Sequence, residues 1–311
     1  MSRRIRVAVV GLGQWGRHHA RIYAGLPEAE LAAVVDVNAG EMRAVAQRYR
    51  TAGYTDYRDV LGRVDAVSVV VPTHLHYEVA RAFLESGAHV LVEKPMTGTL
   101  PEATALVDLA RRTGRLLAVG HVERFKPAVR RLADLAREPL FIQARRVRPY
   151  DRSRTMDVGV VMDLMIHDID IALALAGSRP VQLGGLAVRV HNSHEDLAVA
   201  HLTLASGCRV WLMASRVSAH KASEIEVVTP DRVVRLDYLR QRLSVHRFTG
   251  EVEEHEELHG EEPLRAELAH FVACVAGREQ PLVTGEDGRQ ALEVALALLA
   301  QMTTVTAPVR V

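Results

Sequence analysis

The feature that most constrains the fold is an alternation of short apolar runs with helical stretches over the first 120 residues. The helical patterns lie at 14–24, 41–50, 77–86 and 102–113. The runs between them are rich in β-branched residues and cover Ile5–Val10, Leu31–Asp36, Ala66–Val71, His89–Val92 and Leu116–Val119. Strands that are apolar throughout are typical of a parallel sheet with helices on both faces. The first part of the chain therefore predicts an α/β fold with a doubly wound parallel sheet.

A glycine pattern follows the first predicted strand. Gly11, Gly13 and Gly16 form G-x-G-x-x-G where that strand gives way to a helix, which is the arrangement of a dinucleotide-binding turn. Gly11 permits the tight turn, Gly13 lets backbone N–H groups reach a diphosphate, and Gly16 lets the helix pack closely on the strand. The free N–H groups of the helix N-terminus favour the same diphosphate. Gln14 and Trp15, which lie within this turn, are predicted to bind the cofactor as well.

Asp36 indicates which dinucleotide is bound. It ends the second predicted strand, 20 residues after Gly16, where a carboxylate accepts hydrogen bonds from a ribose 2′-OH and repels a 2′-phosphate. We therefore expect NAD in preference to NADP. Thr73 and His74 follow the third strand, at the sheet edge where open α/β folds bind ligands, and are predicted to line the nicotinamide ribose. For His76 we expect a helix-start or packing role.

After Gly120 the pattern changes to that of an α+β domain. The sequence predicts a helix at 126–137, a strand at Leu140–Arg148, a polar loop at Pro149–Asp157 and a long helix at Val160–Ala176. A series of strands follows at Pro180–Leu258, and two helices at 263–276 and 286–302 close the chain. The series of strands, with turns between them, predicts an open and mostly antiparallel sheet. We expect two domains: a cofactor domain at 1–121, and a substrate-binding, catalytic and oligomerisation domain at 122–311.

Composition excludes several classes of protein. The formal net charge of +1 gives no reason to expect nucleic acid or a membrane surface as partner. No apolar run reaches the about 18–20 residues that a membrane span needs, and the chain begins without a signal-peptide pattern. We therefore expect a cytoplasmic protein. Cys208 and Cys274 are the only cysteines and form no C-x-x-C, which argues against a disulfide framework and a thiolate metal site; no bound metal is expected, and both are predicted to be small buried residues.

Lys94 is singled out by the scarcity of lysine in this chain. Of 39 Lys plus Arg residues only three are lysine, namely Lys94, Lys126 and Lys221. Glu93, Lys94 and Pro95 close the fourth predicted strand at the ligand-binding edge, and Pro95 fixes the turn there. A desolvated lysine can lose its proton near neutral pH, whereas arginine cannot. Lys94 is therefore predicted to be catalytic, and both Glu93 and Lys94 are counted with the cofactor-binding residues.

A second reactive cluster is predicted on the long helix of the second domain. Asp163 and His167 are four residues apart and His167 and Asp170 are three apart, so all three share one face of a helix. A histidine beside a carboxylate is held in one tautomer and can take a proton from an alcohol. Asp163 and His167 are predicted to be catalytic, and Asp168, on another face, is expected to cap or bridge.

The motifs GLGQWG, VEKP and DLMIHDID, in this order, resemble those of the glucose–fructose oxidoreductase and inositol dehydrogenase (Gfo/Idh/MocA) family. The closing TGEDGRQALEVALALL resembles that family's last helix, so the likeness extends over the whole chain. The resemblance implies a Rossmann domain plus an open-sheet domain, with Lys94, Asp163 and His167 as the catalytic set. It also implies a homodimer or homotetramer that associates through the open sheet. Met165 departs from the family, which often has glycine between that Asp and His.

A narrower resemblance points to nucleotide sugars. Gly120–Phe125, read as GHVERF, with Pro127 two residues later, resembles the UDP-N-acetylglucosamine (or uronate) 3-dehydrogenase branch, which usually has Asn where Lys126 stands. Arg124 is a candidate for a substrate phosphate or carboxylate, or for a salt bridge. Five further arginines are expected to be solvated, with a diphosphate cradle as the alternative: Arg145, Arg146, Arg148, Arg152 and Arg154.

These features predict an NAD-dependent dehydrogenase that acts on a secondary alcohol of a sugar, with C3 of a UDP-N-acetylhexosamine or its uronate preferred. Lys94, Arg124, Asp163 and His167 are the expected substrate-binding residues. Two alternatives stay open. One is an inositol or free-sugar dehydrogenase of the same family, and the other is an NAD-binding sensor without turnover.

Overall fold

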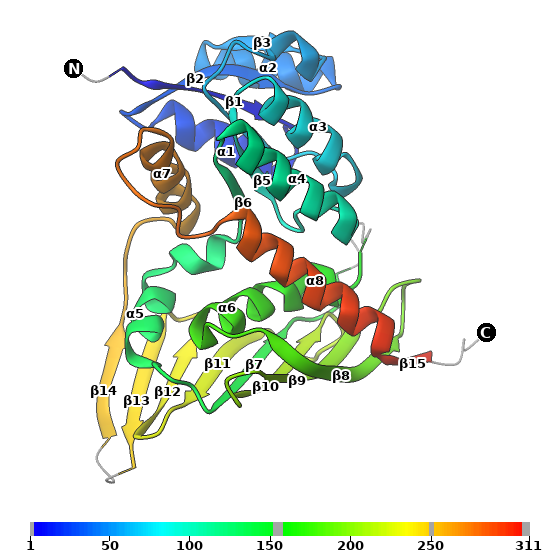
Figure 1. The fold of residues 1–311 in the computed structure, drawn as a ribbon, viewed down its shortest axis with the longest axis vertical. Coiled ribbons are helices and arrows are strands. Elements are labelled where there is room, and N and C mark those ends of the chain that lie inside the picture. Colours follow the sequence, from blue (N-terminus) through cyan, green and yellow to red (C-terminus); the bar gives the residue numbers. More distant parts are fainter. Residues whose placement is uncertain (1–2, 152–157, 249–251, 307–311) are drawn as a thin grey trace. The chain divides into compact units, whose positions relative to one another are not determined.

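The computed structural model describes residues 3–151, 158–248 and 252–306. The chain divides into two compact units, one of residues 1–125 and 261–289 and the other of residues 126–260 and 290–311 (Figure 1). Residues 122–311 were expected to form one domain, but residues 261–289 belong to the first unit. The physical reason is helix α7 (Pro263–Val275), whose Leu268 and Phe271 are buried in the core of the first unit.

The first unit contains a six-stranded parallel sheet in the order β3-β2-β1-β4-β5-β6. The strands are β1 Ile5–Val10, β2 Ala29–Val35, β3 Ala52–Tyr54, β4 Ala66–Val69, β5 His89–Glu93 and β6 Leu117–Gly120. The connecting helices are α1 Gln14–Ala24, α2 Ala39–Tyr49, α3 Thr73–Glu85 and α4 Leu100–Thr113. The predicted doubly wound parallel sheet is confirmed. Strand β3 was not predicted, since its three residues are too few to show a pattern.

The strand order reverses between β1 and β4, which are neighbours in the sheet although β2 and β3 separate them in sequence. Such a reversal opens a crevice at the carboxyl ends of the strands, where α/β sheets bind their ligands. The Gly11–Gly16 turn follows β1 at this position. The topology therefore places the predicted dinucleotide turn at the ligand-binding edge.

The second unit is built on a nine-stranded sheet in the order β14-β13-β12-β11-β7-β10-β9-β8-β15. The strands are β7 Phe141–Val147, β8 Pro180–Arg189, β9 Leu197–Leu204, β10 Arg209–Ser215, β11 Ala222–Val228, β12 Arg232–Asp237, β13 Arg242–Arg247, β14 Val252–Glu257 and β15 Thr303–Thr306. Its pairings are antiparallel except β7 with β10 and β8 with β15. The predicted mostly antiparallel sheet is confirmed, and the short edge strand β15 is an addition to it.

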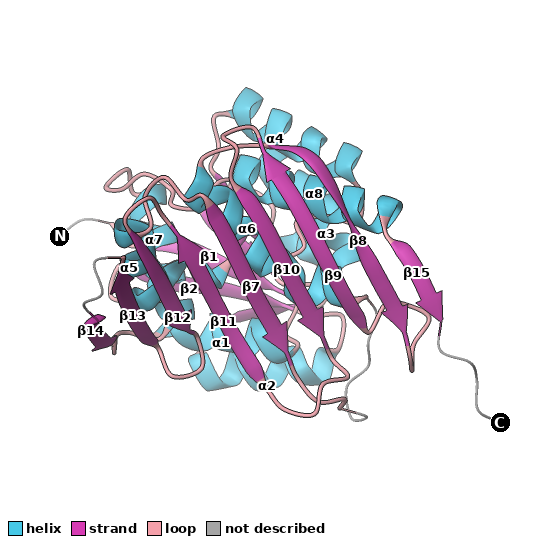
Figure 2. Cartoon of the chain, turned by 90° about the horizontal axis from the view of Figure 1, so that it is seen from below, coloured by secondary structure: helices cyan, strands magenta, loops and turns pink. Residues whose placement is uncertain are grey.

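One face of the nine-stranded sheet is covered and the other is open. Helix α5 (Pro127–Leu135) contacts β12, and α6 (Ile166–Ala176) contacts β10. Figure 2 shows the opposite face, over which no described helix of the unit lies. Alternation along β10 agrees with this, because Val210 and Leu212 are buried whereas Trp211 between them is 57% exposed. The last helix, α8 (Gly285–Gln301), completes the chain before β15.

The helix predicted at Val160–Ala176 is not α-helical from its start. Residues Val161–Met165 form a π-helical turn, η3, and α6 begins only at Ile166. Single π-turns of this kind occur frequently at functional sites. Among the described residues no helix is both long enough and apolar enough to cross a membrane. Cys208 and Cys274 are free; Cys208 is buried and Cys274 is partly buried.

Candidate active site

The glycine turn of the first unit shows why each glycine is needed. Gly11 has φ +92°, and a Cβ there would lie 2.5 Å from the Val70 carbonyl oxygen. A Cβ on Gly16 would lie 1.8 Å from the Gly11 carbonyl oxygen, so α1 can approach β1 only without a side chain there. A Cβ on Gly13 would meet nothing within 4 Å. Packing within the protein therefore explains Gly11 and Gly16, and the open space beside Gly13 fits an approaching ligand.

The start of α1 offers its N–H groups to that space. Gly13 is the N-cap residue, and no side chain caps the helix, so the donors and the positive end of the helix dipole suit a diphosphate. Gln14 and Trp15 form the exposed first turn, with Trp15 51% exposed. Asp36 lies directly after β2, where its Oδ2 accepts the Leu12 N–H at 2.7 Å and its Oδ1 accepts the Asn38 N–H at 2.8 Å. Asp36 is thus fixed beside the glycine turn.

A cavity of about 300 Å³ opens next to Asp36. It is lined by Val10, Gly11, Val35, Asp36, Val37, Thr55, Asp56, Tyr57, Arg58, Val71, Pro72, Leu75, Glu78 and Val79. Apolar side chains from β1, β2 and α3 line this cavity together with the Asp36 carboxylate, which suits the adenosine half of a dinucleotide.

Four polar residues of this cavity were not foreseen. Arg58 pairs with Asp56 at 3.2 Å and Glu78 at 3.1 Å, and lies 4.8 Å from the ring centre of Tyr57. The Tyr57 hydroxyl donates to Glu78 at 2.7 Å, and burial together with that carboxylate raises the pKa of Tyr57 to about 12. Asp56, Tyr57 and Arg58 follow the three-residue strand β3, which has no recognisable pattern, and Glu78 lies on α3. No sequence pattern therefore indicated this group.

Glu93 is an anchor at the end of β5. Its Oε1 lies 3.0 Å from Nε2 of the fully buried His19 on α1, and its Oε2 accepts the Lys94 N–H at 3.3 Å. Burial alone would raise the pKa of Glu93, but the hydrogen bond and charge of His19 outweigh it and hold that pKa below its usual value. Glu93 thus fixes the backbone from which Lys94 extends at the carboxyl edge.

His76 contacts the two segments that follow β4 and β5 at this edge. It is buried on α3, with Nε2 2.8 Å from the Val71 carbonyl oxygen and Nδ1 2.9 Å from the Pro95 carbonyl oxygen. The packing role expected for His76 agrees with these contacts. Thr73 and His74 open α3 beside it, Thr73 half-buried and His74 exposed.

Asp163 and His167 lie in the second unit, on either side of the boundary between η3 and α6. Asp163 sits in the π-turn, so the regular i, i+4 face expected for an α-helix does not apply to it. Arg148 Nη2 lies 3.2 Å from Asp163 Oδ2, with the Arg148 side chain 16% exposed. Asp168 accepts two hydrogen bonds from Arg146, at 3.1 and 2.8 Å, which is the bridging role expected for it.

The arginines singled out in the sequence differ in their burial and in their partners. Arg146 and Arg148 are ion-paired and largely buried, so the expectation that they are solvated is wrong. Arg145 points to the open face and lies 3.7 Å from Glu224. Arg124 donates to the Leu282 carbonyl at 2.7 Å within the first unit. Arg152 and Arg154 lie outside the described residues.

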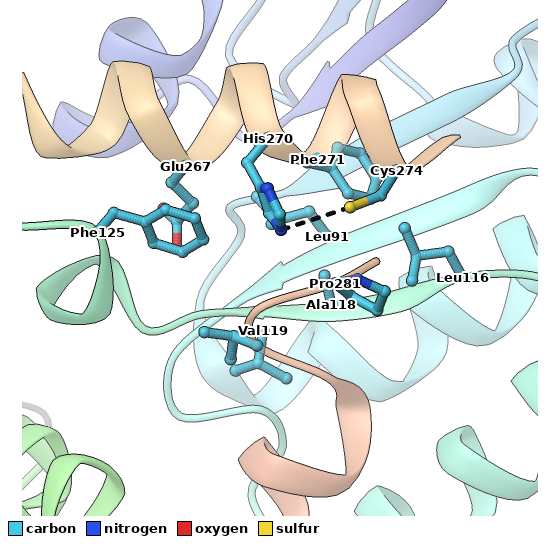
Figure 3. A pocket seen from close by; sticks show the side chains of 11 residues that line it. Leu91, Leu116, Ala118, Val119, Phe125, Glu267, His270, Phe271, Cys274 and Pro281 are labelled. Atoms are coloured by element: carbon cyan, nitrogen blue, oxygen red, sulfur yellow. Dashed lines mark hydrogen bonds between the residues drawn. The ribbon is translucent and has the colours of Figure 1, made fainter. Parts of the chain in front are cut away.

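A small second pocket in the first unit contains a cysteine and a histidine (Figure 3). Cys274 Sγ lies 3.4 Å from His270 Nε2, but the same nitrogen accepts the Leu282 N–H at 2.9 Å. Burial, with Glu279, raises the pKa of the Cys274 thiol to about 11. The pocket volume of about 10 Å³ holds one water at most. This group is therefore a packing cluster, because its thiol stays protonated. The described residues contain no group of three or more His, Cys, Asp or Glu that could hold a metal ion.

The predicted residues thus form two groups. The glycine turn, Asp36, Glu93 and Lys94 share the carboxyl edge of the first sheet, and Asp163 and His167 lie in the second unit.

Comparison with known protein families gives a match in each of the two units. Residues 5–121 match the model of the oxidoreductase family with an NAD-binding Rossmann fold, and residues 138–234 match the GFO/IDH/MocA C-terminal domain. The chain belongs to the Gfo/Idh/MocA oxidoreductase family.

Two relatives, one of them also as a solved structure, show which members of this family the chain is similar to. It is 35% identical to UDP-N-acetylglucosamine 3-dehydrogenase of Acidithiobacillus ferrooxidans, covering 94% of this chain and 95% of the relative. A solved structure of that enzyme gives a TM-score of 0.91 at 34% identity over 97% of this chain and 98% of the other. The chain is 29% identical to the NAD(+)-dependent scyllo-inositol 2-dehydrogenase of Bacillus subtilis, over 96% and 94%. The family resemblance and the assignment to dehydrogenases are thereby confirmed.

The glycine turn generates a prediction that separates binding from folding. Gly13→Ala should leave the melting temperature unchanged and weaken NAD binding, because its Cβ meets only the space assigned to the ligand. Gly16→Ala is the matched variant and should lower the melting temperature, since its Cβ would overlap the Gly11 carbonyl. Thermal unfolding and titration with NAD measure both. Full NAD affinity in Gly13→Ala would contradict this assignment of the site.

Proposed function

We propose that the protein oxidises a secondary alcohol of a sugar with NAD as hydride acceptor, and that the reacting carbon is C3 of a UDP-N-acetylhexosamine or its uronate. The observation that carries the substrate is the 35% identity to UDP-N-acetylglucosamine 3-dehydrogenase over nearly the whole of both chains. The GHVERF segment at Gly120–Phe125 supports the same substrate. The first unit would bind the cofactor and the second unit the sugar.

The choice of NAD rests on Asp36. Its carboxylate is held at the end of β2 by two backbone N–H groups, beside the cavity that fits adenosine. A 2′-phosphate bound there would be repelled by this fixed negative charge, whereas a 2′-OH can donate to it. NAD, when bound, supplies C4 of its nicotinamide as the hydride acceptor.

The protein's own part in the reaction is to remove a proton and orient the alcohol. As the C–H hydride leaves, Lys94 or His167 takes the hydroxyl proton, so that a ketone remains. Asp163 orients the sugar or the imidazole, and Arg148, 3.2 Å away, holds the Asp163 carboxylate in place. Substrate contacts are proposed for Lys94, Asp163 and His167, and for Arg124 beside its bond to the Leu282 carbonyl.

A second candidate is a dehydrogenase of inositol or a free sugar. It is favoured by the 29% identity to scyllo-inositol 2-dehydrogenase, which also extends over nearly all of both chains. The two candidates share the chemistry described above and differ only in whether a nucleotide is part of the substrate.

A substrate panel tests the proposal. UDP-N-acetylglucosamine or its uronate should yield NADH or a 3-keto product, with free hexoses and myo-inositol slow and NADP poorer than NAD in kcat/KM. NADH absorbance and mass spectrometry of the product provide the measurement, and 2-oxoglutarate is added in parallel as hydride acceptor so that retained NADH does not hide turnover. Equal rates with myo-inositol would favour the second candidate, and a preference for NADP would overturn the role of Asp36.

Lys94→Arg tests which residue takes the proton. Arginine keeps the positive charge, so folding and NAD affinity should be retained, but it stays protonated at working pH. Because general acid–base groups typically contribute about 10²- to 10⁴-fold, kcat should fall by about that factor. His167→Asn is the parallel variant, and the larger loss identifies the principal proton acceptor. A near-normal kcat in Lys94→Arg would show that Lys94 does not exchange the proton.

We also propose that the protein forms a homodimer or homotetramer through the open face of the nine-stranded sheet. Exposed apolar side chains gather there: Val199 pairs with Leu186 across β8 and β9, Trp211 on β10 is 57% exposed, and the Phe141 ring lies 6.5 Å from the Trp211 ring. Apolar surface of this kind on a monomer usually marks an interface.

Trp211→Glu should therefore shift the protein towards monomer, because a carboxylate would be buried at the interface without a partner. Leu239→Glu is the matched control, since Leu239 is 48% exposed but lies in the turn between β12 and β13, outside the strands of the sheet. Sedimentation velocity measures the mass of each variant. An unchanged mass in Trp211→Glu would reject this interface.

A further inference from the structure

A buried polar network lies behind the π-turn that carries Asp163. Arg216 and Asp196 form an ion pair at 2.8 Å, and both side chains are fully buried. Asp196 also accepts the backbone N–H groups of Val190 at 2.8 Å and His191 at 2.7 Å. Burial alone would raise the pKa of Asp196, but these N–H donors and Arg216 hold it well below its usual range. The pair is thus fully charged at neutral pH and fixed to the β8–β9 connection.

The network reaches the π-turn through backbone groups on both sides of Gly159. Arg216 donates from Nη1 to the Val158 carbonyl at 2.9 Å and from Nη2 to the Glu195 carbonyl at 3.2 Å. That Glu195 carbonyl also accepts the Val160 N–H at 3.1 Å. The residues that immediately precede η3 are therefore bonded to a rigid charged group.

Glu195 completes the attachment with its side chain. Its Oε1 accepts the Val161 N–H, the first of η3, at 3.0 Å, and the side chain is largely buried. A Cβ on Gly159 would lie only 1.9 Å from the same Oε1, so glycine is required for the carboxylate to reach this donor. The Gly159 carbonyl in turn accepts the Asp163 N–H at 3.0 Å. One chain of contacts thus runs from Arg216 through Glu195 and Gly159 to Asp163.

We propose that Glu195, supported by Arg216 and Asp196, is a positioning residue for Asp163 and His167. Unlike a general packing contact, it caps the start of the turn from which the Asp163 side chain extends. A displacement of about 1 Å in a reacting group can cost about 10²-fold in rate, so loss of this cap should reduce catalysis while leaving the cofactor unit unaffected. This inference rests on the proposed function of Asp163 and His167.

The test compares Glu195→Ala with Glu195→Gln. Glu195→Ala removes the acceptor for the Val161 N–H, and kcat should fall about 10- to 100-fold with the NAD dissociation constant unchanged. Glu195→Gln keeps an oxygen acceptor at that position and should recover most of the loss. Glu256→Ala is the matched control, because Glu256 is a partly buried glutamate of the same unit that pairs with Arg131 on α5, and its kcat should remain normal.

Gly159→Ala supplies a coupling test that a non-specific loss of stability would not reproduce. In the wild-type background its Cβ displaces Glu195, so kcat should fall as far as in Glu195→Ala. In the Glu195→Ala background the obstructing carboxylate is gone, and the same substitution should cost little more. The proposal would be overturned if Gly159→Ala lowered kcat by the same factor in both backgrounds. It would also be overturned if kcat of Glu195→Ala stayed within about twofold of wild type.

Titration of the His167 ring by NMR provides a readout that needs no substrate. If Glu195 positions the turn that carries Asp163, the His167 midpoint should move in Glu195→Ala and remain in place in Glu195→Gln and Glu256→Ala, because His167 follows that turn directly and a displaced turn changes the charges around it. An unmoved midpoint in Glu195→Ala would reject the positioning role. If the wild type oxidised none of the sugars tested, the proposed function would fail, and this titration would still decide the positioning role.

Discussion

The close approach of α1 to β1 is the contact on which the cofactor half of this protein depends. Gly16 lies so near the Gly11 carbonyl that any side chain would overlap it. This approach directs the uncapped N-terminus of α1 towards the carboxyl edge, where Asp36 is tied to the Leu12 N–H. The sheet order then brings β4 and β5 to the same edge, and with them His76 and Lys94. The proposed diphosphate site, the proposed ribose acceptor Asp36 and Lys94 are thereby brought to one edge of the sheet.

Each unit holds its reactive side chains by buried polar contacts on their backbone. In the first unit His19 fixes Glu93, and the two ring nitrogens of His76 lie 2.8 and 2.9 Å from the carbonyl oxygens of Val71 and Pro95, which flank the edge that carries Lys94. In the second unit Arg216 and Glu195 fix the residues that open η3. Buried charges are costly unless they are paired and hydrogen-bonded, so such groups adopt few arrangements. They provide the rigidity that a catalytic geometry requires.

The open sheet of the second unit has a different physical basis. Its inner face is buried under α5 and α6, whereas Trp211 and Val199 on the outer face remain exposed. An antiparallel sheet can leave one face to solvent, but that face is then usually polar. The exposed apolar side chains on this face are the reason to propose that another copy of the chain covers it.

Sequence alone predicted most of the fold, because the fold depends on local patterns, and local patterns also singled out the two groups of candidate residues. Apolar runs gave five of the six strands of the first sheet, the glycine spacing gave the dinucleotide turn, and the rarity of lysine drew attention to Lys94. The strand β3 and the cavity residues Tyr57 and Arg58 were missed, since three residues carry no periodicity.

Tertiary structure decided what depends on contacts between distant residues. It moved residues 261–289 into the first unit, because α7 buries apolar side chains there. It turned Arg146 and Arg148 from expected surface charges into partners of Asp168 and Asp163. It also replaced the first turn of a predicted helix by a π-turn bonded to Glu195. A sequence pattern specifies which face of an element is apolar, but only folding selects the partner of a buried charge, since that partner lies far along the chain and is fixed by packing.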